Sequence, residues 1–192
     1  MSATMAILTI GVVPVETILP LLIEHISEQQ ITHFSLLGKM DPQDALTEYR
    51  VDRGETPLPT RLSDGSIAMV SRQKVERDLQ SVIEVMDNQG YDVILLMSTA
   101  DICGLNARNA ILIEPQRIIP PLVASIVDGH QVGVIVPIPE LMQQQQRKWS
   151  VLEKTPLYTL AHPYKATEYE LVTAGKELIE QGEIGRASCR ER

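Results

Sequence analysis

Two hydroxyl side chains, those of Ser98 and Thr99, directly follow the apolar run DVILLM at residues 92–97. A run that is short and apolar throughout is typical of a strand buried on both faces of a parallel sheet. Ligands bind such sheets beyond the carboxyl ends of the strands, where the next helix presents unpaired backbone N–H groups. Hydroxyls at this position can bind a carboxylate or a phosphate, or they can cap the next helix and satisfy a buried turn.

A histidine occupies the equivalent position in a later part of the chain. His162 follows the strand-like run PLYTLA, where an imidazole can bind a carboxylate or act as a base. The alternative is a loop histidine without a role. The four histidines have no ligand-like spacing and the cysteines form no CxxC pair, so the sequence does not support a metal site. It also holds no glycine-rich phosphate loop, and we expect no cofactor.

Three basic side chains, those of Arg72, Lys74 and Arg77, gather near an expected helix start. An arginine there can hold a substrate carboxylate through two parallel hydrogen bonds. The alternative is a solvated helix face on which these cations pair with Glu76 and Asp78. The sequence leaves both alternatives open.

The elements that must position these residues alternate between strands and helices. Strands are expected at residues 6–13, 32–38, 92–97, 110–114, 131–137 and 156–161. Helices are expected at residues 15–26, 41–50, 75–90, 118–127, 139–149 and 166–182. Pro20 predicts a kink or a later start in the first helix, and Pro115 or Pro120 opens the fourth. The alternation favours mainly parallel sheets with helices on both faces.

An Asp64–Gly65 pair between two strand-like runs predicts a β-hairpin inserted near residues 56–70. The segment GVVPVE near the start resembles VIVPIPE near residue 137, since each closes a strand on Val-Pro before a helix. We therefore expect two flavodoxin-like or Rossmann-like three-layer α/β/α halves. Residues 1–114 would form the first domain, with its site strand at 92–97, and residues 115–182 an incomplete second domain.

The last residues differ in composition from the helix before them. The segment EIGRASCRER at residues 183–192 has no apolar periodicity and looks like the translation of a sequencing adapter, so we interpret it as a non-native tail. Its residues 184–192 hold three arginines and one glutamate, and without them the chain is more acidic than its net charge of −8. An acidic protein repels polyanions, which argues against nucleic acid and anionic membranes as partners.

No apolar run approaches the roughly 18–20 residues of a membrane span, and no secretory signal is evident. A cytoplasmic protein is therefore expected. A homodimer is one assembly that the sequence leaves open.

Four long segments are similar to the AroM family: AILTIGVVP, HFSLLGK, VSRQKVERDLQSVIEVMDNQGYDVILLMSTA and IEPQRIIPPLVASIVDGHQVGVIVP. The resemblance covers essentially residues 1–182. It implies a link to aromatic biosynthesis through the gene neighbourhood that names the family, and no assigned activity. The family in turn resembles the aspartate/glutamate racemase superfamily, in which two pseudo-symmetric α/β domains enclose the active site and each supplies one catalytic cysteine.

The first of these cysteines belongs to a Cys-Asn-Thr-Ala-like segment, which MSTA at residues 97–100 matches here with Met97 in place of the thiol. A thioether has no proton to give and is no base at neutral pH. Cys103 could replace that thiol if the loop folds back, or it is a spectator. The second cysteine would lie in a segment beyond the native residues of this chain.

The resemblance implies a small carboxylate metabolite bound in an interdomain cleft. It implies these substrate-binding residues: Gly11, Pro14, Met97, Ser98, Thr99 and Ala100 on one side, and Pro137 and His162 on the other. Cofactor-independent isomerase or racemase chemistry at the carbon next to the carboxylate is one implied function. The alternative, favoured by Met97, is a non-catalytic ligand-binding or regulatory protein.

Overall fold

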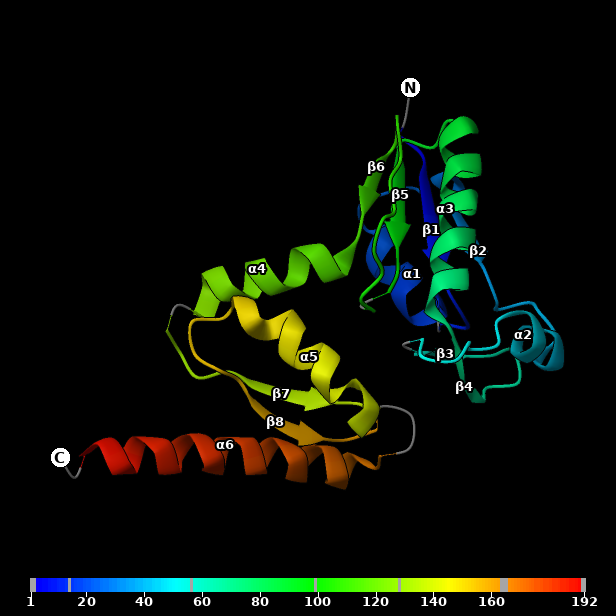
Figure 1. The fold of residues 1–192 in the computed structure, drawn as a ribbon. Helices are drawn as coiled ribbons and strands as arrows, with labels where there is room; N and C mark the ends of the chain where they lie inside the picture. Colours follow the sequence, from blue (N-terminus) through cyan, green and yellow to red (C-terminus); the bar gives the residue numbers. More distant parts are fainter. Residues whose placement is uncertain are drawn as a thin grey trace. The chain divides into compact units, whose positions relative to one another are not determined.

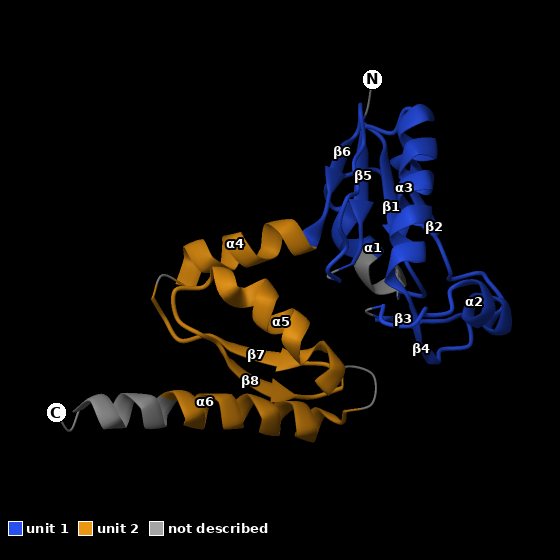
Figure 2. Ribbon diagram, in the orientation of Figure 1, with its two compact units in different colours: residues 1–115 blue, residues 116–192 orange. Residues whose placement is uncertain are grey.

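The computed structural model describes residues 3–13, 15–55, 57–98, 100–127, 129–162 and 166–190, with backbone alone at 15–18 and 183–190. The chain divides into two compact units, residues 1–115 and 116–192, coloured blue and orange in Figure 2. It is a mixed α/β protein whose parallel sheets are flanked by helices, as the alternating pattern predicts (Figure 1). Within the described residues, every helix is too short or too polar to span a membrane.

A four-stranded parallel sheet forms the centre of the first unit. Its strands are β1 (Met5–Thr9), β2 (Ile31–Ser35), β5 (Val93–Leu96) and β6 (Ile111–Ile113), in the order β2-β1-β5-β6. The central strand is apolar because both of its faces are covered, and Ala6, Ile7 and Leu8 are fully buried. This order places β2 and β5 on opposite sides of β1.

The strand β1 ends at Thr9, four residues before the predicted end at residue 13. Beyond Thr9 the backbone no longer pairs within the parallel sheet, and it bonds to the loop after β2 and to the end of the strand at residues 57–61. The Leu37 amide donates to the Ile10 carbonyl at 2.7 Å, and the Val12 amide donates to the Arg61 carbonyl at 2.9 Å. The apolar run therefore continues past the sheet, where Ile10 is buried in the core and Val12 and Val13 are partly buried.

The long helix α3 (Arg72–Asn88) supplies much of the core of this unit. Its Val75, Leu79, Ile83 and Met86 recur at intervals of three and four and are buried, as the sequence pattern predicts. The helix starts at Arg72, three residues earlier than the apolar pattern, because the Ser71 hydroxyl accepts from the Lys74 amide and caps it.

Shorter helices complete the first unit. They are α1 (Val15–Ile23), the 3₁₀ turn η1 (Glu28–Gln30) and α2 (Pro42–Glu48). Pro20 lies inside α1, so it does not delay the start of that helix. The Asp41 carboxylate accepts from the Gln43 amide, which fixes the start of α2 at Pro42 as the Asp-Pro pair predicts.

The predicted hairpin is confirmed as β3 (Pro57–Arg61) and β4 (Ile67–Ser71), paired antiparallel. Gly65 turns the chain between them with φ +83°, a backbone conformation that favours glycine. Leu58, Leu62 and Val70 are buried in the core of the first unit. The hairpin is thus an integral part of this unit rather than a peripheral insertion.

The second unit contains a two-stranded parallel sheet, β7 (Gly133–Val136) and β8 (Leu157–Leu160). Its helical elements are α4 (Pro115–Val127), η2 (Pro139–Leu141), α5 (Met142–Lys148), η3 (Trp149–Val151) and α6 (Glu168–Arg190). Pro115 opens α4, while Pro120 lies inside it. The helix α6 packs along both strands, and a Cβ at Gly133 would lie 3.0 Å from Leu178 (Figure 1).

The backbone of α6 continues to Arg190, eight residues beyond the predicted end near Gly182. No proline interrupts residues 183–190, and Gly185 weakens the helix without breaking it. The composition of this segment marks a change along the chain, but it does not end the helix.

Candidate functional site

The carboxyl ends of β1 and β5 define the candidate site of the first unit. The chain passes from β1 to β2 on one side of β1, and it later enters β5 on the other side. The strand order therefore reverses between β1 and β5. In open α/β sheets, ligands bind outside the carboxyl ends of the strands at this reversal. The loops that leave these two strands contain Gly11 and the segment 97–100, two of the regions that sequence analysis selects.

Gly11 lies where the end of β1 contacts the hairpin and β2. A Cβ at this position would overlap the carbonyl oxygen of Arg61, and the neighbouring Val12 amide donates to that oxygen. The Gly11 carbonyl itself accepts from the Ser35 hydroxyl at 3.1 Å. Gly11 is therefore needed for the close approach of the hairpin and β2 to the end of β1, a role that its position in the sequence does not reveal.

The loop after β5 places Met97, Ser98 and Ala100 together at the end of the sheet. The Met97 amide donates to Leu8 of β1, and the Ser98 amide donates to Leu96. The half-buried Ser98 hydroxyl oxygen accepts from the Ala100 amide at 3.2 Å. Its O–H donor has no acceptor among the residues that the structure describes, so Ser98 can both stabilise the turn and donate to a ligand. Thr99 and Pro14 lie outside the described residues.

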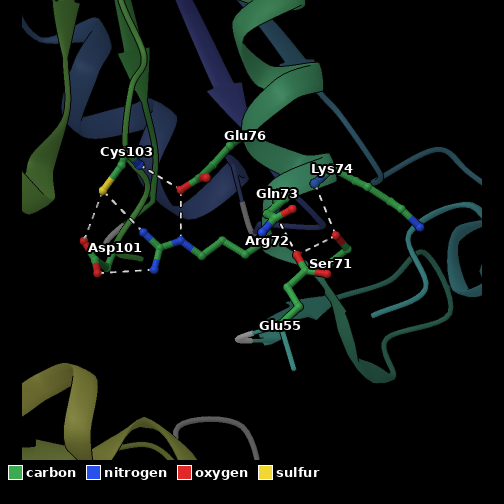
Figure 3. A network of polar contacts seen from close by, with 8 residues as sticks. All are labelled: Glu55, Ser71, Arg72, Gln73, Lys74, Glu76, Asp101 and Cys103. Carbon is green, nitrogen blue, oxygen red and sulfur yellow. Dashed lines mark hydrogen bonds and ion pairs between the residues drawn. The ribbon is translucent and has the colours of Figure 1, made fainter. Parts of the chain in front are cut away.

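A polar network joins this loop to the first turn of α3 (Figure 3). The Arg72 guanidinium donates to Glu76 through Nε at 2.9 Å, to Asp101 through Nη1 at 3.4 Å and to the Cys103 sulfur through Nη2 at 3.3 Å. The Cys103 amide also donates to Glu76 at 2.9 Å. Burial opposes the charge of Arg72, but bonding to Glu76 and the charge of Asp101 raise its pKa. Arg72 thus connects α3 to the loop after β5, and its charge is balanced by Glu76 and Asp101.

The amino end of α3 is also occupied by a side chain of the protein. The Glu55 carboxylate accepts from the Ser71 hydroxyl at 2.7 Å and from the Gln73 amide at 2.8 Å. These hydrogen bonds lower the pKa of Glu55, which keeps it charged. The carboxylate therefore takes the place that an external anion would need at this helix start.

The other basic side chains of this segment are also paired. Arg77 donates to Asp78 at 2.7 Å, and Lys74 donates to the Arg50 carbonyl at 3.0 Å. The alternative of a helix face with internal ion pairs is thus confirmed for Arg72 and Arg77.

Cys103 is an exposed free thiol whose pKa is raised. Burial and the negative charge of Asp101 raise it, and the opposing effect of Arg72 is smaller. Because the thiolate is the nucleophile, a raised pKa makes this thiol a weak nucleophile and a weak base at neutral pH. Its geometry therefore gives it a packing and hydrogen-bonding role beside Arg72.

We expect Cys103 to be alkylated by iodoacetamide at pH 7.5 several-fold more slowly than glutathione. The raised pKa lowers the fraction of thiolate, which is the reacting species. The measurement uses the Cys189→Ala variant, so that one thiol remains. The rate should rise when Asp101 is replaced by asparagine, since one source of the shift is removed. A rate above that of glutathione would contradict the assignment of a protonated thiol.

Pro137 and His162 lie in the second unit, after the paired ends of β7 and β8. The Ala161 amide donates to the Val136 carbonyl at 3.1 Å, which holds the two strand ends together. His162 lines an open pocket of about 400 Å³ between the end of β8 and the first turns of α6. The acidic side chains of Glu170 and Glu177 also line it. The structure thus places Gly11, Met97, Ser98 and Ala100 after strands of the first unit, and Pro137 and His162 after strands of the second.

Sequence reasoning did not find the contacts that link distant segments. Arg72 and Cys103 stand 31 residues apart, and no spacing rule connects them. The carboxylates of the pocket lie seven residues apart on one face of α6, a helical spacing that the sequence does show. Thr167 and Glu170 also form the reciprocal bonds of a capping box, a signal that the sequence contains.

Comparison with known proteins identifies the family. No curated protein and no solved structure matches the chain. The family model described as AroM protein matches residues 5–184, which include both units and both groups of candidate residues. The chain therefore belongs to the AroM family.

Proposed function

We propose that the protein binds a small carboxylate metabolite at the carboxyl ends of β1 and β5. The observation that carries this proposal is the strand order β2-β1-β5-β6, whose reversal lies beside the loop of Ser98. The helix α1 begins at Val15, directly after the loop that leaves β1, and its first backbone N–H groups favour an anion. The O–H of Ser98 adds a neutral donor at the neighbouring strand end.

We expect the affinity for the carboxylate to be modest, because the positively charged side chains near the site already have partners. Arg72 is balanced by Glu76 and Asp101, and Lys74 bonds to a backbone carbonyl. In this proposal, backbone amides and a hydroxyl supply the attraction for the ligand. Arg72 and Lys74 do not add to it, because they already bond to other groups of the protein. Such a site distinguishes a carboxylate by hydrogen-bond geometry more than by charge.

Binding without catalysis is favoured over racemase-type chemistry by two residues. Met97 stands where the resemblance to racemases implies a thiol, and a thioether cannot transfer a proton. Cys103 has a raised pKa, which disfavours the thiolate that would remove a proton from carbon. Racemase-type chemistry is retained as the second candidate because the family resembles that superfamily.

The Ser98→Ala variant should bind the carboxylate about tenfold more weakly than the wild type, since one hydrogen bond to a charged group is lost. A panel of acetate, malonate, succinate and α-amino acids is titrated while amide NMR shifts are recorded. Ser81→Ala, an exposed serine of α3 whose hydroxyl bonds to the Arg77 carbonyl, is the matched control. Equal affinities of the two variants, or no saturable shift with any acid, would exclude this site.

A second measurement separates binding from catalysis. The acid that binds most tightly is incubated with the protein in D₂O, and its Cα proton signal is followed. A binding protein leaves this signal unchanged, whereas a racemase replaces the proton with deuterium.

A further inference from the structure

The pocket between β8 and α6 carries a set of side chains that the carboxylate proposal does not use. All of its lining residues belong to the second unit, so it is formed within that unit alone. It lies where β8 ends and α6 begins, the position at which parallel α/β sheets bind ligands. Its volume of about 400 Å³ lies in the range of pockets that hold small molecules.

The lining of this pocket combines an apolar wall with negative charge. Leu160, Ala161 and Ala174 supply apolar surface, while Glu170 and Glu177 supply two carboxylates. Among the residues that the structure describes, neither carboxylate forms an ion pair. The described lining of the pocket therefore carries negative charge, which favours a cation.

Both carboxylates are held in place by neutral donors. Glu177 accepts from the Thr159 hydroxyl of β8 at 3.1 Å through one oxygen. Glu170 accepts from the Thr167 amide at 2.7 Å and from its hydroxyl at 2.9 Å, also through one oxygen. Each carboxylate keeps a second oxygen that has no acceptor role within the described part of the chain. These oxygens are available to a donor that carries charge.

An aromatic ring completes the lining. Tyr169 lines the pocket and is 79% exposed. A cation near an aromatic face is attracted by the ring quadrupole. Carboxylates, an aromatic ring and an apolar wall are together the groups that recognise an organic ammonium compound.

We propose that this pocket binds a small organic amine, with its ammonium group at Glu177 and Glu170 and its carbon chain against Leu160 and Ala174. The pocket is formed by residues of the second unit and the carboxylate site by residues of the first, so neither proposal depends on the other. A metal ion is a poorer fit, because no cluster of three ligand side chains occurs among the described residues.

The test is an NMR titration of the 192-residue chain with n-butylamine, n-butanol and butyrate at constant ionic strength. We expect butylamine to produce saturable shifts at the amides of Ala161, His162 and Ala174. The Glu177→Gln variant, which keeps an acceptor for Thr159, should bind it about two- to fivefold more weakly. Glu180→Gln removes the same charge from an exposed position of α6 outside the pocket and should bind as the wild type does.

Three results would overturn the proposal. The first is the absence of saturable butylamine binding to the wild type. The second is equal binding of butylamine and butyrate, which would show that charge does not select the ligand. The third is equal affinity of Glu177→Gln and Glu180→Gln, with both variants giving the amide spectrum of a folded protein.

Discussion

Replacing Gly11 by alanine is expected to destabilise the protein by about 3 kcal/mol, the sum of an overpacking cost and a lost hydrogen bond. The added Cβ would overlap the backbone carbonyl oxygen of Arg61 and would lie 3.0 Å from the Thr60 side chain. No rotamer change relieves an overlap with backbone, so the hairpin must move away from β1. That movement lengthens the bond from the Val12 amide to Arg61, which is 2.9 Å in the native fold.

The measurement is urea unfolding of the variant and the wild type, followed by far-UV circular dichroism. Gly175→Ala is the matched control, because a Cβ there meets no atom within 4 Å. Since alanine is the better helix former, the control should gain up to about 1 kcal/mol. A loss below about 1 kcal/mol for Gly11→Ala would show that the hairpin can shift freely and is not fixed by this contact.

Gly11 also shows where the sequence stops being informative. The sequence predicts a strand at residues 6–13 that includes Gly11, whereas β1 ends at Thr9 and Gly11 lies in the loop after it. The ligand-lining role of Gly11 is what the family resemblance implies. Arg61, the group that requires a glycine there, is 50 residues away, and nothing near Gly11 in the sequence indicates it. Local patterns predict which element a residue ends, but long-range approach decides what its backbone touches.

The elements that were predicted well are those specified by local chemistry. The hairpin follows from the Asp64–Gly65 turn, and α3 follows from apolar residues at helical spacing, although the cap at Ser71 starts it three residues earlier than this pattern. The predicted end of β1 lies four residues too late, because residues 10–13 continue the apolar pattern without pairing in the parallel sheet. Strand order could not be predicted, since periodicity identifies strands without pairing them.

For the candidate site too, the sequence predicts local features and does not predict long-range contacts. Sequence reasoning selected Ser98 because a hydroxyl after a buried strand has a defined chemical use, and the structure places it at the reversal of strand order. It could not reveal that Arg72 is balanced by Asp101, 29 residues away. It leaves the role of His162 open, and it does not reveal that two glutamates line the pocket beside this histidine. The charge of a site depends on all of its neighbours, which only the fold brings together.

Asp87 is expected to be the polar side chain whose replacement lowers stability most. It lies near the end of α3, where the helix dipole disfavours a carboxylate. Its oxygens nevertheless accept from the backbone amides of Arg108, Asn109 and Ala110 at 3.0, 3.0 and 2.6 Å. The Asn109 side-chain amide donates as well, at 3.2 Å. One carboxylate thus holds the loop that leads into β6, and it is only 6% exposed.

The Asp87→Asn variant should melt several degrees below the wild type, because an amide nitrogen cannot accept a hydrogen bond. Whichever way the new side chain turns, its NH₂ group faces at least one backbone N–H that has lost its acceptor. Asp92→Asn is the control, since Asp92 accepts from the Thr4 amide and hydroxyl at an exposed position. Differential scanning calorimetry at pH 7 compares the melting temperatures of the variants. Equal decreases would show that the hydrogen bonds to Asp87 stabilise the fold no more than those to Asp92.

The pH dependence provides an independent check on the same carboxylate. The hydrogen bond from the Ala110 amide is the largest of the effects that hold the pKa of Asp87 below its ordinary value. A depressed pKa contributes stability that is present above the unfolded value of about 3.9 and is lost as pH falls through the folded value. The wild type should therefore lose more of its melting temperature than Asp87→Asn between about pH 5 and pH 3. Parallel losses would mean that the charged form of Asp87 is not favoured by folding, which would contradict the bonding described above.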